Sequence, residues 1–284
     1  MRILREVLAT LEERLRPVAG GEARTEAELM LSHLTGKRRL ELYLDNAPVE
    51  EETLTPALET SLSMRLRGMP IQYAVGRAFF WDFELAVDTR VLIPRDDTEL
   101  LVEIALRVMG RGCPLVIEVG VGSGAVSIAL ARESGAFVLG TELSPDARDM
   151  AEANAALLGL SDRIAVYEGD CLEPLSGMGV AGLASAVVCN PPYIRSDEMP
   201  LLPPETRWEP LLALDGGEDG LDLTKRVVAG AAEFLRPGGL LALEVGWDQA
   251  RGVASLINRS HMYGVAEVHR DLSGMERVVS ARRV

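Results

Sequence analysis

The segment Asn190-Pro191-Pro192-Tyr193 follows an apolar run and combines residue types suited to holding an amino group. Consecutive prolines fix the backbone φ angle and remove amide donors, so the segment presents carbonyl oxygens as acceptors. The Asn190 side-chain oxygen and the Pro191 carbonyl can together accept both hydrogens of a planar –NH2 group. Tyr193 can offer its ring face to the group that carries this nitrogen. We therefore predict that the four residues form a catalytic site, with a ligand-free, proline-stiffened turn as the alternative.

A second chemical signal is the segment 120–124, whose glycines are spaced G-x-G-x-G between an expected strand and an expected helix. Glycine lets the backbone approach a ligand closely, and dinucleotide sites use the different spacing G-x-G-x-x-G. A carboxylate, Glu142, follows about 20 residues later, where it can accept hydrogen bonds from two ribose hydroxyls. The pair indicates an adenosyl ligand without phosphates, although a bare turn and a helix-capping carboxylate remain open. The residues predicted to bind this ligand are Gly120, Val121, Gly122, Ser123, Gly124, Glu142 and, from the strand-end site, Asn190.

The elements that must position these residues are strands that alternate with helices from about residue 98. Such alternation is typical of a parallel sheet covered on both faces, and it predicts an α/β, Rossmann-like fold. Ser144 and Pro145 are expected to open one of the helices. The last two strands, joined by the short loop 271–275, are expected to be antiparallel. The expected strands are Leu115–Val119, Phe137–Thr141, Ile164–Tyr167, Ala186–Cys189, Leu240–Val245, Tyr263–Arg270 and Glu276–Ala281.

The N-terminal part has helical periodicity, beginning with an apolar stripe from Leu4 to Leu15. A second helix is predicted to start at the capping box Thr25–Glu28, and a third at Thr55-Pro56. The alternating, aromatic-rich segment Phe79–Val91 predicts two short strands. The expected domains are a helical bundle at 1–75, a β-hairpin linker at 76–97 and an α/β domain at 98–284.

The composition argues against several classes of protein and partner. The chain has 284 residues, a net charge of −14, 48% hydrophobic and 25% charged residues, which is typical of a soluble globular protein. No apolar run approaches the roughly 18 residues of a membrane span, and the acidic balance argues against a nucleic-acid partner. Three cysteines without close pairing, Cys113, Cys171 and Cys189, argue against a disulfide framework or a metal cluster. We therefore expect a cytoplasmic protein with no metal and no membrane partner.

The motifs together resemble the class I methyltransferases that use S-adenosyl-L-methionine, and specifically the peptide chain release factor glutamine methyltransferases (HemK/PrmC family). The resemblance covers essentially the whole chain. Besides the two motifs above, it includes Pro70–Tyr73 with Gly76, Val91–Arg95 with Thr98-Glu99, Glu209-Pro210, Ala213-Leu214, Gly216-Gly217, Asp219–Leu221, Arg236–Gly239 with Glu244 and Gly246, and Asp271–Gly274 with Glu276-Arg277.

This resemblance implies an enzyme that moves a methyl group from S-adenosyl-L-methionine to the side-chain amide nitrogen (N5) of the glutamine in the Gly-Gly-Gln motif of release factors. It implies a seven-stranded class I methyltransferase sheet and an N-terminal helical domain that recognises the substrate. It places the turn Asp170-Cys171 at the adenine, with Asp170 as the binding residue and Cys171 as a packed side chain. The chain has Glu118 and Glu142 where the family more often has aspartate, and Asp96 in place of a proline.

Two other functions remain open. Asn-Pro-Pro-Tyr is also similar to the amino-methyltransferases of adenine in DNA and guanine in ribosomal RNA, because an extruded base presents a planar –NH2 group as well. The net charge and the absence of a lysine-rich arm count against this N6-adenine or other nucleic-acid reaction. The second alternative is a degenerate cofactor-binding module that assembles with the translation machinery. The intact glycines and Asn190 argue against it. We expect the protein to be a monomer.

Overall fold

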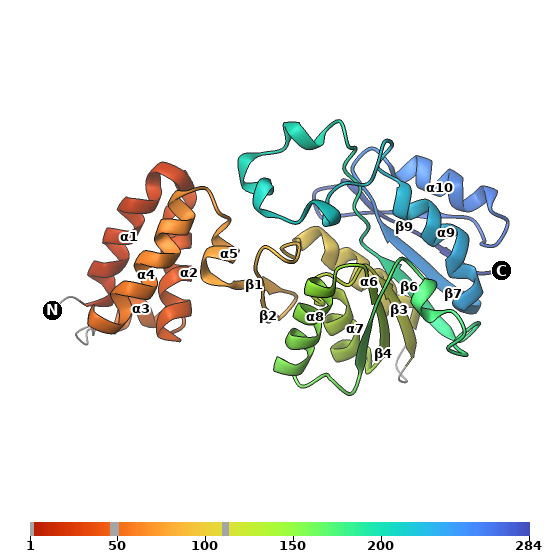
Figure 1. Cartoon of the computed structure of the whole chain (residues 1–284), viewed down its shortest axis with the longest axis horizontal. Helices are drawn as coiled ribbons and strands as arrows, with labels where there is room; N and C mark the ends of the chain where they lie inside the picture. Colours follow the sequence, from red (N-terminus) through yellow and green to blue (C-terminus); the bar gives the residue numbers. More distant parts are fainter. Residues whose placement is uncertain (1–2, 46–50, 110–113) are drawn as a thin grey trace. The chain divides into compact units, whose positions relative to one another are not determined.

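The computed structural model describes residues 3–45, 51–109 and 114–284, with the backbone alone at 51–53. The chain divides into two compact units (Figure 1). One consists of Met1–Arg77 with Pro203–Trp208, and the other of Ala78–Leu202 with Glu209–Val284. The limits predicted for the domains stay a prediction. Cys113 lies outside the described residues.

The first unit is helical and has its own apolar core. Buried side chains from its helices, among them Leu8, Leu15, Leu31 and Leu62, form one cluster. The segment 203–208 joins this unit, because Arg65 pairs with Glu205 as well as with Glu26. The helices are α1 (Leu4–Ala19), α2 (Ala23–Thr35), α3 (Glu41–Leu44), α4 (Glu51–Leu66) and α5 (Ile71–Val75).

Both predicted helix starts in this unit are wrong. Helix α2 begins at Ala23, so Thr25 lies inside it, because the buried Ala23 extends the packed face upstream of the capping box. Helix α4 begins at Glu51 and contains Pro56. Pro56 lies in the second turn, where proline removes one backbone hydrogen bond and crowds the carbonyl four residues back, so the local signal for a start at Thr55 does not set the helix limit.

The second unit contains a seven-stranded sheet with the order β5-β4-β3-β6-β7-β9-β8. The strands from β5 to β7 in this order are parallel, while β9 runs antiparallel to both of its neighbours. The chain builds the sheet outward from β3 to one side and then from β6 to the other, so the order reverses between these two strands. A ligand crevice is expected at such a reversal, outside the carboxyl ends of the strands. The strands are β3 (Leu115–Val119), β4 (Phe137–Glu142), β5 (Ile164–Glu168), β6 (Ala184–Cys189), β7 (Leu235–Glu244), β8 (Glu267–Arg270) and β9 (Glu276–Arg282).

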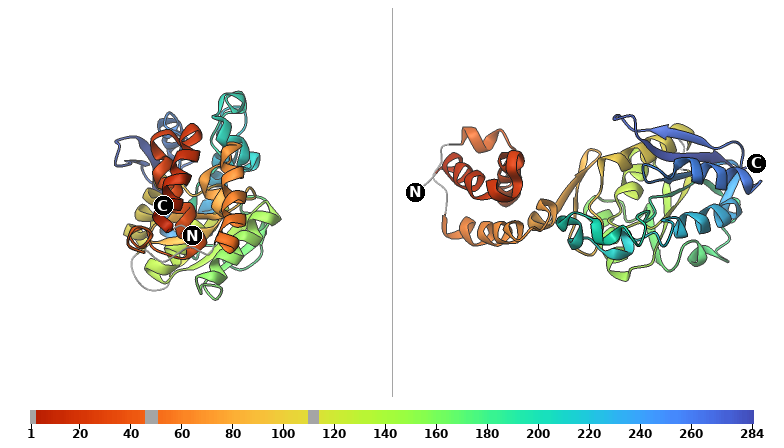
Figure 2. Two further views of the ribbon diagram at one scale, coloured as in Figure 1. Left: turned by 90° about the vertical axis from the view of Figure 1, so that its left-hand side faces the viewer. Right: turned by 90° about the horizontal axis from the view of Figure 1, so that it is seen from above.

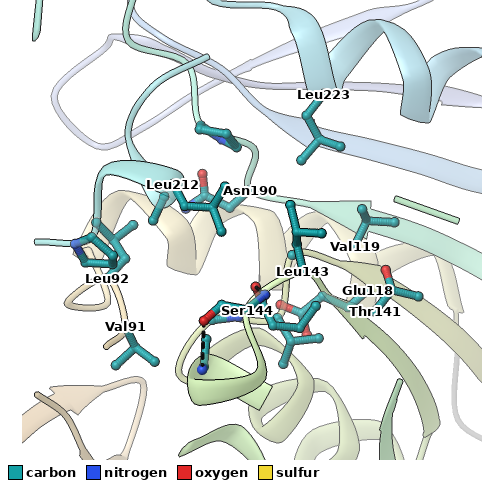
Figure 3. Close-up of a pocket in the computed structure, with 18 of the residues that line it drawn as sticks. Val91, Leu92, Glu118, Val119, Thr141, Leu143, Ser144, Asn190, Leu212 and Leu223 are labelled. Atoms are coloured by element: carbon teal, nitrogen blue, oxygen red, sulfur yellow. Dashed lines mark hydrogen bonds between the residues drawn. The ribbon is translucent and has the colours of Figure 1, made fainter. Parts of the chain in front are cut away.

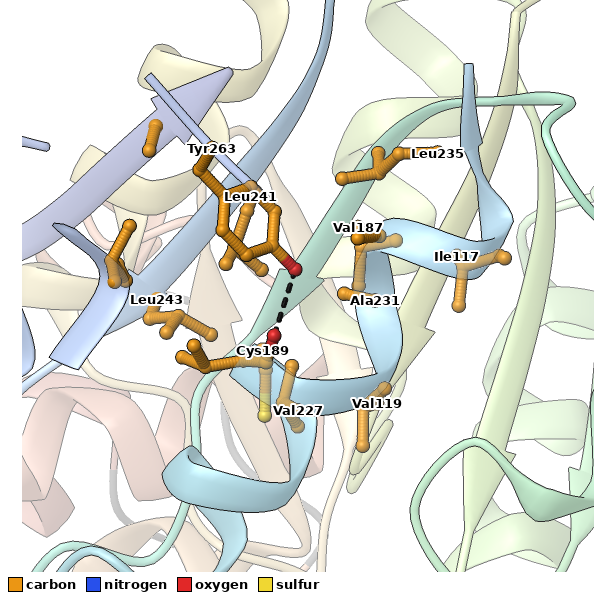
Figure 4. Packing of buried hydrophobic residues seen from close by; sticks show 14 of the residues in the cluster. Ile117, Val119, Val187, Cys189, Val227, Ala231, Leu235, Leu241, Leu243 and Tyr263 are labelled. Carbon is orange, nitrogen blue, oxygen red and sulfur yellow. Dashed lines mark hydrogen bonds between the residues drawn. The ribbon is translucent and has the colours of Figure 1, made fainter. Parts of the chain in front are cut away.

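Helices cover both faces of this sheet (Figures 1 and 2). On one face, α9 and α10 bury alternate strand residues such as Ile117, Val187 and Leu241 (Figure 4). The residues of opposite parity are also buried, against α6, α7 and α8. These helices are α6 (Glu99–Met109), α7 (Ala125–Ser134), α8 (Pro145–Leu157), α9 (Asp222–Phe234) and α10 (Ala250–Arg259). Short 3-10 turns lie at Gly20–Glu22, Asp96–Thr98, Glu173–Leu175, Met199–Leu201, Pro204–Trp208 and Leu211–Ala213.

The predicted α/β fold class is confirmed, with small differences at the strand limits. The last hairpin is antiparallel as expected, but β8 begins at Glu267. Tyr263 makes only an isolated bridge to Arg283, and the Ala266 N–H donates to the Asn258 side chain, which takes this stretch out of the ladder. The two short strands predicted upstream are β1 (Arg77–Phe80) and β2 (Phe83–Ala86), which pair with each other in a separate two-stranded sheet. None of the helices in the described ranges is long and apolar enough to cross a membrane.

Candidate active site

A pocket of about 290 Å³ opens at the carboxyl ends of β3, β4 and β6, where the strand order reverses (Figure 3). Loops after these strands line it, together with the turn after β5, the segment 90–98 and residues between 210 and 226. The lining includes most predicted site residues: Gly120, Val121, Gly122, Ser123, Glu142, Asp170, Cys171, Asn190 and Pro192. Three predicted residues are not among its lining residues: Gly124, Pro191 and Tyr193. The fold therefore brings two sequence motifs 70 residues apart into one cavity.

The glycine loop needs its glycines for backbone conformation. Gly120, Gly122 and Gly124 have φ angles of 74°, 57° and 88°, in the left-handed region that side chains disfavour. Space for a Cβ atom is open at Gly120 and Gly122, so their backbone faces the cavity without obstruction. Gly124 instead caps helix α7, where a Cβ atom would touch Ala151 at 3.4 Å. The loop can therefore approach a ligand closely through its first two glycines.

Glu142 ends β4 and stands between two loops. Its carboxylate accepts hydrogen bonds from the N–H of Gly122 at 2.9 Å and of Ser144 at 3.0 Å. Ser144 in turn caps α8 by accepting from the Ala147 N–H, as the sequence predicted. A carboxylate has about four acceptor positions, so two remain at Glu142 for hydroxyl groups of a ligand.

Glu118 lies in the pocket wall at the end of β3, only 3% exposed. Burial raises its pKa to about 8, although a hydrogen bond from the Ser127 hydroxyl opposes this rise. Glu118 is therefore largely protonated at neutral pH and can donate as well as accept hydrogen bonds.

Asn190 directly follows β6, and its Nδ2 atom donates to the Thr98 Oγ1 atom at 3.1 Å. Its Oδ1 atom is thereby left as an acceptor at the pocket. The backbone after it is held firmly, because the Tyr193 carbonyl accepts from Gln249 Nε2 at 2.9 Å and Ile194 pairs with residues 214–216. Burial raises the pKa of Tyr193 to about 12, so its phenol is neutral.

The turn after β5 places Asp170 and Cys171 in the pocket wall. Asp170 forms an ion pair with Arg226 at 2.8 Å and is partly exposed. Cys171 is buried with a φ of 52°, and burial raises the pKa of its thiol. Its side chain packs in the core beneath α9. The contacts therefore favour packing for the thiol and leave Asp170 facing the cavity.

Similarity to known proteins is extensive. The PrmC N-terminal domain matches residues 6–76. The release factor glutamine methyltransferase of Moorella thermoacetica is 40% identical, over 99% of this chain and 98% of its own. That of Gloeobacter violaceus is also 40% identical, over 89% of this chain and 88% of its own.

This chain belongs to the release factor glutamine methyltransferases. The predicted family and the predicted enzyme class, a methyltransferase, are confirmed. Among solved structures, a methyltransferase from Pyrococcus furiosus is 16% identical, covers 70% of this chain and 87% of its own, and has a TM-score of 0.52. A METTL16 catalytic domain solved with an RNA hairpin is 16% identical, covers 80% of this chain and 81% of its own, and has a TM-score of 0.56. Both share the fold.

In this glutamine methyltransferase, sequence reasoning missed several pocket residues. Arg95 lines the cavity, and its Nη2 atom lies 2.6 Å from both carboxylate oxygens of Glu209, whose pKa burial raises. Thr98 lines it as the partner of Asn190. Both residues lie in segments that carry the family resemblance, and that resemblance is the feature of the sequence that could have identified them. The spacing of Arg95 and Glu209 in the sequence does not predict that they form an ion pair.

Proposed function

We propose that this protein transfers a methyl group from S-adenosyl-L-methionine to the N5 amide nitrogen of the glutamine in the Gly-Gly-Gln motif of peptide chain release factors. The observation that carries the proposal is Asn190, whose Nδ2 atom is engaged by Thr98 while its Oδ1 atom is left at the pocket. An acceptor beside a glycine loop suits a substrate with a donor –NH2 group. The relatives at 40% identity bear the name release factor glutamine methyltransferase.

The residues of the pocket fit S-adenosyl-L-methionine. Gly120 and Gly122 leave open space for the amino-acid part, and the free acceptor positions of Glu142 suit the two ribose hydroxyls. Asp170 and Cys171 line the same pocket and would hold the adenine, with Asp170 as the hydrogen-bonding residue. When bound, this cofactor supplies a methyl group on a positively charged sulfur, which keeps the bonding electron pair when the methyl group leaves.

The protein has to make a poor nucleophile react. The lone pair of an amide nitrogen is shared with its carbonyl group, so reaction requires that this resonance be lost. Asn190 Oδ1 would hold one amide hydrogen, and the carbonyl of Pro191, which lies between the pocket-lining Asn190 and Pro192, would hold the other, so that the nitrogen is aimed at the methyl group. The same acceptors stabilise the positive charge that grows on nitrogen as the new N–C bond forms. The methylated nitrogen then loses one hydrogen as a proton to water.

The family indicates the macromolecule on which this protein acts. A release factor is the proposed protein substrate, and the net charge of −14 supports a protein rather than a nucleic acid. Cytoplasmic location, absence of a membrane partner and a monomeric state stay predictions, the last of which light scattering can check. Binding to DNA or RNA that weakens with salt at physiological ionic strength would favour the alternative N6-adenine or other nucleic-acid reaction.

The direct experiment combines the protein, S-adenosyl-L-methionine and a release factor, and locates the new methyl group by mass spectrometry. We expect a single methyl group on the glutamine of the Gly-Gly-Gln motif. A release factor with alanine in place of that glutamine is the matched control and should stay unmodified. Unmodified glutamine in the natural release factor, with donor binding shown by calorimetry, would refute the proposal.

A further inference from the structure

Two buried polar residues that the proposed chemistry does not use meet at Asn190. Glu244 ends β7, and the pairing of Cys189 with Leu243 in the adjacent strands puts Asn190 and Glu244 side by side. Thr98, just before α6, contributes the hydroxyl that accepts from Asn190 Nδ2 at 3.1 Å. Thr98 is 4% exposed and Glu244 is 2% exposed.

The buried Glu244 carboxyl is only partly satisfied by hydrogen bonds. Its Oε2 atom has no hydrogen-bond partner in the part of the chain that the structure describes. Burial raises the pKa of Glu244 to about 7, and hydrogen bonds from Thr98 and Asn190 hold the pKa back from rising further. Leaving a carboxyl group buried in this way costs folding free energy, so a function for it is expected.

The side-chain amide of asparagine has two nearly isosteric orientations. In its ionised form the Glu244 carboxylate accepts hydrogen bonds but cannot donate them, so it attracts the Nδ2 group of Asn190 and repels the Oδ1 atom. The Thr98 hydroxyl, which donates its hydrogen to Glu244, has only lone pairs left for Asn190. Both neighbours therefore favour Nδ2 toward the sheet and Oδ1 toward the pocket.

We propose that Thr98 and Glu244 are positioning residues, which hold the Asn190 amide with its oxygen toward the pocket and thereby select a methyl acceptor with an –NH2 group. The proposal rests on the proposed function. In the opposite orientation, Asn190 would present an NH2 group to the substrate's own NH2 group, and the two donors would repel each other. The pair thus influences the choice of substrate through the orientation of Asn190.

The test compares Thr98→Val, which keeps the shape and removes the hydroxyl, with Thr98→Ser, which keeps the hydroxyl. We expect Thr98→Val to lower kcat for release factor methylation by about 10-fold to 100-fold, because small misplacements of reacting groups cost this much. Thr98→Ser should recover most of the rate. The dissociation constant of S-adenosyl-L-methionine should stay within about twofold. Thr224→Val is the matched control, since Thr224 is also buried but is not a pocket-lining residue.

A second comparison separates positioning from a general structural role. If Thr98 acts through Asn190, Thr98→Val should cause no further loss of kcat in an Asn190→Ala background. Glu244→Gln, whose amide can donate to Asn190 Oδ1, should lower kcat in the same non-additive way. Losses that multiply in the double variants, or a Thr98→Val enzyme with unchanged kcat, would overturn the proposal.

A third readout does not depend on methyl transfer. In the full-length protein, the side-chain amide protons of Asn190 should exchange slowly with water by NMR, and Thr98→Val should speed this exchange. Unchanged exchange would overturn the positioning role. If the wild-type protein leaves release factors unmethylated while Thr98→Val alters this exchange, the proposed function fails but the positioning of Asn190 stands.

Discussion

Asn190 concentrates the chemistry that distinguishes this pocket from a simple nucleotide site. In the proposed reaction its oxygen accepts from the substrate, while its nitrogen donates to Thr98, which lies 92 residues earlier in the chain. We expect Asn190→Ala to lower kcat at least about 100-fold, as loss of one electrostatic contact at a reacting group does. The affinity for S-adenosyl-L-methionine, measured by calorimetry, should change little. Equal loss of cofactor affinity and turnover would contradict the assigned role.

Glu118 is the residue whose ionisation should be visible in stability. Its pKa is raised from 4.5 to about 8 in the folded protein, so the folded state retains a proton that the unfolded state has lost. The stabilisation associated with this proton is complete below about pH 4.5 and is lost as pH rises through about 8.

Glu118→Gln should therefore unfold at a temperature that rises relative to the wild type as the pH increases from 5 to about 8.5. Thermal unfolding of both proteins without cofactor, over this pH range, measures the difference. Ser127→Ala is a useful companion, because it removes the hydrogen bond that opposes the rise in the pKa of Glu118. Parallel curves for wild type and Glu118→Gln would show that Glu118 is already ionised in the folded state.

At the scale of elements, the Asn-Pro-Pro-Tyr strand end is held by a loop and a helix start rather than by its own prolines alone. Gln249, just before α10, donates to the carbonyls of Tyr193 and Gly220 at 2.9 and 3.2 Å and accepts from the Gly246 N–H at 3.0 Å. The approach is tight, since a Cβ atom at Gly220 would lie 2.5 Å from the Tyr193 oxygen. Three loops thus share one buried amide.

Gln249→Leu should remove all three of these hydrogen bonds and leave two carbonyls and the Gly246 N–H without this partner. We expect a loss of at least about 3 kcal/mol in the free energy of unfolding, measured in urea, because each orphaned group costs about 1 to 3 kcal/mol. The KM for the release factor should also rise, since the segment Asn190–Tyr193 loses the contact that holds the Tyr193 carbonyl. Gln249→Glu keeps the acceptor and is the matched control for the Gly246 contact; wild-type stability in Gln249→Leu would show that the amide does not hold the loops.

At the scale of the whole molecule, the helical unit incorporates a short segment from the second half of the chain. Arg65, whose side chain is 5% exposed, binds Glu26 at 2.7 Å and Glu205 at 2.9 Å. Arg65→Met should destabilise the protein by about 3 to 5 kcal/mol, because it leaves the buried Glu26 without a counter-charge. Glu205→Ala, which removes the half-exposed partner, should cost no more than about 1 kcal/mol. Equal effects in denaturant unfolding would contradict this ranking.

Residue type and local sequence pattern are enough to predict most strands of the sheet and one helix start. Apolar runs that alternate with helical stretches predicted the strands of the sheet, and Ser144 with Pro145 marked a helix start because capping depends on neighbours in sequence. The same reasoning failed at Thr25, where burial of Ala23 outweighs a local cap. The residue types and spacing of the G-x-G-x-G and Asn-Pro-Pro-Tyr motifs likewise predict an adenosyl ligand and an acceptor site for an –NH2 group.

Only the tertiary structure shows which buried residues surround the Asn190 side chain. The pairing of β6 with β7 brings Glu244 beside Asn190, and the turn before α6 adds Thr98. These contacts join residues that are 54 and 92 positions apart, so no local propensity specifies them. The orientation of one amide is set by buried neighbours whose energies depend on the packed sheet, because a carboxyl group acquires its donors and its raised pKa only where the fold excludes water.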